Sequence, residues 1–231
     1  MRVRATAVLG ITTALLTQPA CSPGTDTDRA ATTAPHSSVQ HQDNDNSENT
    51  PLSSAALETQ LLTQQDLGNG YVHAPGTSTD HDDVAVVGCP ALDALGGEAA
   101  TGGSLDFPRQ AKTGFTYDAS SGSALSEDLY SDTADALSAG TSRIFDAMTG
   151  CPTYEVLVGG TAINVSTREL AAPRLGDEQW SQLMTFTAGG RDTVLKQTAI
   201  REDQVLLVLS GSPALVDLHL SKALAKVTAA R

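Results

Sequence analysis

The sequence lacks the short motifs that identify enzymes of several common classes. No serine has a glycine two residues away on both sides, so the nucleophile elbow of the α/β-hydrolases is absent. The chain also has no GxxxxGK[ST] phosphate loop, no GxGxxG fingerprint and no HExxH zinc motif. We therefore expect no catalytic residue, no cofactor and no metal, and we predict a protein that is not an enzyme.

Basic residues are also scarce. Lys and Arg number 14 against 27 Asp and Glu, which gives a formal net charge of −13. Removing residues 1–20 would take away Arg2 and Arg4 but no acid, so the charge would move from −13 to about −15. A surface this acidic repels DNA, RNA and anionic lipid head groups, and we expect no nucleic-acid partner.

The sequence has no apolar stretch near its start that is long enough to cross a bilayer. Residues 5–16 are apolar, Gly or Thr, about 12 positions, whereas a spanning helix needs roughly 20. Together with Arg2 and Arg4 this run is typical of a secretory signal peptide. Ala20 then precedes Cys21, which favours a lipoprotein signal over residues 1–20, with Cys21 diacylated and holding the protein on the extracytoplasmic face of the cell membrane. Ordinary secretion with cleavage nearby is the alternative.

Cysteines number only three, and an odd count in an exported protein leaves one to explain. If Cys21 carries lipid, Cys89 and Cys151 remain as a pair in an oxidising compartment, and we predict a disulfide between them. Two separate buried thiols are the alternative.

Aromatic residues are absent and Leu, Ile and Val nearly absent from residues 22–55, where Ser, Thr, Asp, Asn, Gln and Pro dominate. Such a composition cannot bury enough surface to fold, so residues 21–55 are predicted to form a disordered acidic linker. Residues 56–231 remain as one domain of sufficient size for a core.

The periodicity of residues 56–231 predicts strands joined by hairpins, with separate helices. Gly189-Gly190 is a hairpin signal, and "QVLLVLSG" is typical of a central buried strand. These features predict an α+β fold, an antiparallel sheet with helices packed on one face. Helices are expected near 63–67, 90–94, 132–149 and from 213; strands near 71, 84–87, 111–119, 123–131, 161–170, 180–188, 194–200 and 204–211.

Four short segments carry a resemblance to a known family. They are "LLTQQDLGNGY", "GCPTY", "APRLGDEQW" and "REDQVLLVLSGS". With them the chain resembles actinobacterial exported lipoproteins whose domain is similar to the extracellular sensor domain of PknH-type receptor Ser/Thr kinases. The resemblance implies a sheet-and-helix domain with a cleft for an external ligand. It also implies two disulfides, of which this chain can form only one.

The most informative charged cluster is "PRLGDEQW". A turn at Gly176-Asp177 would place Arg174, Asp177, Glu178 and Trp180 on the rim of the sheet, where a charged fork beside a flat aromatic ring suits a sugar or an anionic head group. The alternative is that Asp177 caps the turn and Trp180 lies in the core.

Two further candidate positions have a simpler interpretation. The acidic run 80–83 could hold a cation weakly but is expected to be a solvated loop, and His219 is expected at the surface of the last helix.

Three functions are compatible with these features. A sensor-like accessory lipoprotein that binds a small ligand or an envelope partner is preferred, because it requires no catalytic residues. A lipid or glycolipid carrier would require a large cavity lined by Val, Leu and Ile. A structural envelope protein would show a filled core and a flat surface.

Overall fold

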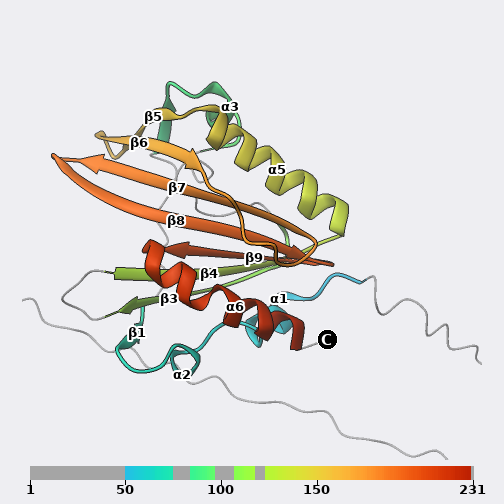
Figure 1. The fold of residues 1–231 in the computed structure, drawn as a ribbon. Coiled ribbons are helices and arrows are strands. Elements are labelled where there is room, and N and C mark those ends of the chain that lie inside the picture. The colour runs from blue at the N-terminus through green and yellow to red at the C-terminus, as the bar shows by residue number, and fades with distance from the viewer. Residues whose placement is uncertain (1–49, 75–83, 97–106, 118–122, 230–231) are drawn as a thin grey trace, which may run out of the picture. The chain divides into compact units, whose positions relative to one another are not determined.

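The computed structural model describes residues 50–74, 84–96, 107–117 and 123–229 (Figure 1). Their elements form one nine-stranded antiparallel sheet in the order β1-β3-β4-β9-β8-β7-β6-β5-β2, together with helices. The predicted α+β class is confirmed. The helices are α1 (Ser54–Glu58), α2 (Gln64–Leu67), α3 (Pro90–Asp93), α5 (Ala134–Gly150) and α6 (Pro213–Ala229). The strands are β1 (Tyr71–His73), β2 (Val84–Val87), β3 (Gln110–Tyr117), β4 (Ser123–Ser131), β5 (Thr153–Val158), β6 (Thr161–Glu169), β7 (Glu178–Ala188), β8 (Arg191–Glu202) and β9 (Val205–Gly211).

Residues 52–55, which the sequence analysis assigned to the linker, take part in the structure around α1. The hydroxyl of Ser53 caps α1 by accepting from the backbone N–H of Ala56. Leu52 packs against the core, and its backbone N–H donates to the Ser131 hydroxyl at 2.8 Å. The predicted signal peptide, Cys21 and most of the predicted linker lie outside the described residues, and so does the acidic run 80–83.

The two long helices lie on opposite faces of the sheet, which corrects the prediction that all helices pack on one face. The core cluster beneath α6 contains Val205, Leu207 and Leu209, whereas the cluster beneath α5 contains the alternate residues Leu206 and Val208. A strand that is apolar at every position must be covered on both sides, which explains the two layers of helix.

Helix α6 also fixes the segment that contains α1 and α2. The ammonium group of Lys226 donates to the Leu61 carbonyl at 2.5 Å and to Oδ2 of Asp66 at 2.6 Å, and Lys222 donates to the Asp66 carbonyl. Asp66 forms a capping box with Thr63 at the start of α2. The hydrogen bond from Lys226, assisted by Thr63, lowers the pKa of Asp66 to about 2.

His219 lies on the inner face of α6, contrary to the expectation that it would be at the surface. It is 6% exposed, and its Nε2 lies 2.5 Å from the hydroxyl of Tyr71 on β1. Burial lowers the pKa of His219, and nearby Lys222 lowers it further. The pair joins the edge strand to the helix.

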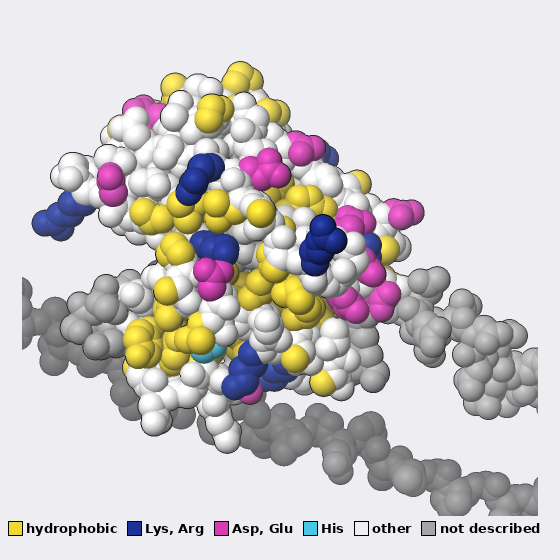
Figure 2. All heavy atoms as spheres, in the orientation of Figure 1, with side chains coloured by type: hydrophobic (Ala, Val, Ile, Leu, Met, Phe, Trp, Pro, Cys, Tyr) yellow, Lys and Arg dark blue, Asp and Glu magenta, His cyan; other side chains and the backbone are white. Residues whose placement is uncertain are grey.

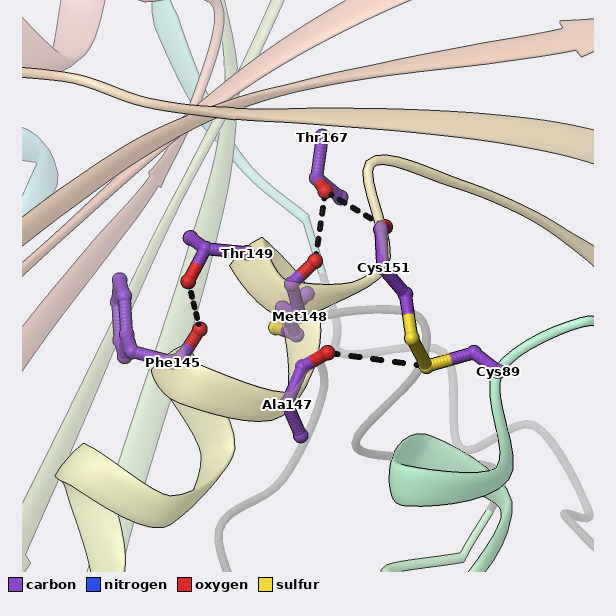
Figure 3. Close-up of a disulfide and its surroundings, with 7 residues drawn as sticks. All are labelled: Cys89, Phe145, Ala147, Met148, Thr149, Cys151 and Thr167. Atoms are coloured by element: carbon purple, nitrogen blue, oxygen red, sulfur yellow. Dashed lines mark hydrogen bonds between the residues drawn. A yellow bond between two sulfur atoms is a disulfide. The ribbon is translucent and has the colours of Figure 1, made fainter.

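The predicted disulfide between Cys89 and Cys151 is present, with the two Cα atoms 5.8 Å apart (Figure 3). It joins the start of α3 to the C-terminal end of α5. Beside it the Thr167 hydroxyl of β6 donates to the carbonyls of Met148 and Cys151, at 2.7 and 3.1 Å. The end of α5 is therefore attached to the sheet by a covalent bond and by hydrogen bonds to carbonyls that the helix itself leaves unpaired.

Candidate functional site

The charged residues predicted as a ligand-binding rim lie around Arg201, which was not among the predicted site residues. Nη1 of Arg201 is 3.0 Å from Oδ2 of Asp177, and Nη2 is 2.9 Å from Oε1 of Glu178. The turn before them approaches β8 closely, since the Asp177 N–H donates to the Arg201 carbonyl at 2.8 Å. Gly176 permits this approach, because a Cβ there would lie 2.6 Å from the same carbonyl oxygen. Arg174 is exposed.

This arrangement has a structural consequence for the rim. Only 10% of the Arg201 side chain is exposed, and a buried guanidinium must be compensated by charged or carbonyl partners. Asp177 and Glu178 supply those partners, and Nη1 also donates to the Asp203 carbonyl at 2.9 Å. Arg201 offsets one of their two negative charges, so at most one is left for a ligand. The assignment of Arg174, Asp177, Glu178 and Trp180 as ligand residues stays a prediction.

Trp180 combines the two alternatives that the sequence left open. It is half-buried and packs against the core cluster beneath α5, with its ring centroid 6.3 Å from that of Phe145. It also lines a cavity of about 290 Å³, which we call the Trp180 pocket. The other described lining residues are Phe145, Asp146 and Thr149 of α5, together with residues 169–172, 179 and 181.

Three segments distant in the sequence build the Trp180 pocket. Helix α5 forms one wall, and the Thr149 hydroxyl donates to the Phe145 carbonyl at 2.7 Å along that wall (Figure 3). The segment after β6 is held beside β7 by a hydrogen bond from the Leu170 N–H to the Ser181 carbonyl at 2.9 Å. On β8 the residue opposite Trp180 is the small Ala199, which leaves room for the indole.

The electrostatic character of the Trp180 pocket is anionic. Asp146 and Glu169 line it and are both exposed, and none of the described residues that line it is Lys, Arg or His. The pocket also lies at the C-terminal end of α5, where the helix dipole is negative. Figure 2 shows further acidic side chains spread over the face in view. Asp146 and Glu169 were not among the residues predicted from the sequence, where only the neighbouring Trp180 indicated this place.

A second hollow, of about 270 Å³, lies over β5, β6 and β7. Most of its lining is polar and uncharged, with Glu155 as the one charged side chain among the described lining residues. The cross-strand neighbours Glu155 and Asn164 alternate along their strands with Tyr154 and Val165, which belong to the core beneath α5. The hollow is therefore on the opposite face of the sheet from α5, and the aromatic residue among its described lining residues, Tyr154, is buried.

Two carboxyl groups with strongly shifted pKa values lie elsewhere. Burial raises the pKa of Glu127 to about 7 and that of Asp128 to about 6, and both belong to β4. Neither residue is part of the lining of the two cavities. In the described ranges, no group of three or more His, Cys, Asp or Glu side chains is placed to hold a metal ion.

Comparison with solved structures gives a relationship at the level of the fold. The crystal structure of the extracellular domain of PknH from Mycobacterium tuberculosis matches with a TM-score of 0.55 and 13% sequence identity, covering 78% of this chain and 98% of that one. The fold resembles that PknH domain. The resemblance expected from the sequence is therefore confirmed for the architecture.

Other comparisons add little. The X-ray structure of an uncharacterised Mycobacterium smegmatis protein, an Rv0999 ortholog, matches with a TM-score of 0.35 and 14% identity over 77% of this chain and 92% of that one, too weak for an inference. No protein-family model matches, and no curated protein matches. In the part of the chain that the structure describes, no helix is both long and apolar enough to cross a membrane.

Proposed function

We propose that this chain is an extracytoplasmic lipoprotein, anchored through Cys21, whose domain binds a small ligand in the Trp180 pocket and catalyses no reaction. The observation that supports it most is the pocket itself, a cavity of about 290 Å³ whose lining combines two aromatic residues with polar and acidic side chains. That combination, at the lower end of the usual size range, is typical of small-molecule sites.

The extracytoplasmic location rests on three independent features. The apolar run that ends at Cys21 favours export and lipidation. The Cys89–Cys151 disulfide is of the kind that persists in oxidising compartments. The fold resembles a domain described as extracellular.

The described cavities favour a small-ligand site over the alternative of a lipid or glycolipid carrier. A carrier needs a large space lined by Val, Leu and Ile, whereas both cavities are below about 300 Å³ and their linings are mixed or polar. A purely structural envelope protein is the remaining alternative, and it would leave the Trp180 pocket without an occupant.

Two measurements test the proposal. Metabolic labelling with palmitate should mark the wild-type chain, and Cys21→Ser should abolish the label; an unlabelled wild-type chain would refute the anchor. Native mass spectrometry of the full chain from its own host should detect a bound small molecule that Trp180→Ala releases. A ligand-free spectrum under conditions that preserve the fold would contradict the binding function.

A further inference from the structure

We propose that the Trp180 pocket selects a small organic cation, an amine or a quaternary ammonium compound, an inference that rests on the proposed function and names its ligand class. Three physical features of the described residues favour positive charge at the same place. They are aromatic faces, carboxylates and the end of a long helix.

The aromatic wall is the first feature. Trp180 and Phe145 both line the cavity, with ring centroids 6.3 Å apart and planes inclined by 34°. The face of an aromatic ring carries partial negative charge and attracts ammonium groups, and among side chains tryptophan does so best. An alkylated ammonium ion also places methyl or methylene groups against the rings, so it gains from burial that a metal ion would not.

The carboxylates are the second feature. Asp146 belongs to α5 and Glu169 ends β6, so the two acids reach the cavity from different elements. Asp177 and Glu178, in contrast, are paired with the guanidinium of Arg201.

The helix end is the third feature. Helix α5 has 17 residues and ends at Gly150, one residue after Thr149 of the pocket wall. The carbonyls of its last turn carry partial negative charge, which favours cations near them. The net charge of the chain, −13, adds a longer-range attraction of the same sign. An anion would meet unfavourable interactions with all of these groups, and a neutral sugar would gain stacking and hydrogen bonds from them but no charge–charge attraction.

The single tryptophan of the chain makes the test specific, because Trp180 emission reports only on this pocket. The probes are choline and 3,3-dimethylbutan-1-ol, which has nearly the same shape but no charge. The full chain is held in a non-ionic detergent, since phosphocholine detergents would themselves supply the cation. We expect choline to bind about tenfold or more tightly than the alcohol. Asp146→Asn and Glu169→Gln should each weaken choline binding about two- to fivefold, and added salt should weaken it in the wild-type chain.

A matched control is available on the same helix. Asp135 is an exposed acid in the first turn of α5, 11 residues or about 16 Å from Asp146, so Asp135→Asn should leave the affinity for choline unchanged. The salt dependence in the wild-type chain tests the inference even if a pocket variant does not fold.

The outcomes separate this inference from the proposed function. Equal affinity for choline and the alcohol, or no response to either, would overturn the cation inference. A small molecule retained in the native mass spectrum would then still support binding in the pocket. Loss of choline binding in Asp135→Asn as well as in the pocket variants would also overturn the inference, because it would show a general effect of surface charge.

Discussion

Glu127 gives the sharpest test of the interior, because it is a carboxyl group buried between the sheet and the N-terminal segment. It is 1% exposed, and its Oε2 accepts a hydrogen bond from the Leu62 N–H at 2.5 Å. Its Oε1 is buried without a hydrogen-bond partner in the part of the chain that the structure describes. The charges that act on it are those of Lys226 on α6, Asp66 on α2 and the adjacent Asp128.

Desolvation is the largest effect on this group, and it raises the pKa of Glu127 from 4.5 to about 7. The folded state therefore holds a proton that the unfolded chain releases between those two values, so the free energy of unfolding decreases as pH rises through this interval. One pKa unit corresponds to about 1.4 kcal/mol, so the contribution changes by about 3 kcal/mol between pH 4.5 and 8. The free-energy cost of ionising the buried Glu127 is present in full above pH 7 and disappears at acid pH.

Glu127→Gln should remove this part of the pH dependence, because the amide keeps an acceptor for Leu62 but cannot ionise. We expect the stability of the variant relative to wild type to increase by about 3 kcal/mol from pH 4.5 to 8. For a domain of this size that equals a relative shift in Tm of roughly 6–12 °C. Urea unfolding followed by circular dichroism measures the difference, with the exposed Glu58→Gln on α1 as a control. If the wild-type and Glu127→Gln profiles run parallel across this range, the carboxyl group is not desolvated as described.

Two further variants test the links on which the sheet and its rim depend. Replacing both Cys89 and Cys151 by Ser should lower the free energy of unfolding by about 4 kcal/mol, because the disulfide closes a loop with a sequence separation of 62 residues. Two free thiols titrated in the unreduced, denatured wild-type chain would contradict the disulfide. Gly176→Ala should destabilise the fold more than Gly189→Ala, as measured by Tm. Both glycines have positive φ, but only at Gly176 would the new Cβ meet backbone, the Arg201 carbonyl at 2.6 Å.

Local sequence patterns predicted the elements well where adjacent residues decide the conformation. The capping box at Thr63 and the hairpin at Gly189-Gly190 are both present. The order of the strands was not predictable in the same way. The edge strands β1 and β2 pair with β3 and β5, and β4 pairs with β9 far along the chain, so these contacts depend on the packing of the whole sheet.

The position of His219 on the buried face of α6 could have been predicted from the helical spacing of its neighbours. Val216, Leu220 and Val227 recur at the spacing of one helix face, and His219 lies three residues after Val216 on the same side of the helix. Its polar ring argued for the surface. The buried hydroxyl of Tyr71, 2.5 Å from Nε2, is the hydrogen-bond partner that allows the ring to be buried. Tyr71 belongs to a distant strand, so the sequence of the helix alone could not predict it.

The candidate site combines a residue that the sequence indicated with others that it did not. Trp180 was singled out because an aromatic residue followed a charged turn, but Asp146 and Glu169 belong to elements with no local sign of a site. What brings them together is the fixed end of α5. The Cys89–Cys151 bond holds that end from one side, and the hydrogen bonds from Thr167 to the Met148 and Cys151 carbonyls hold it against β6. Because two independent links fix one wall of the Trp180 pocket, the pocket is formed before any ligand arrives, and little ordering entropy opposes binding there.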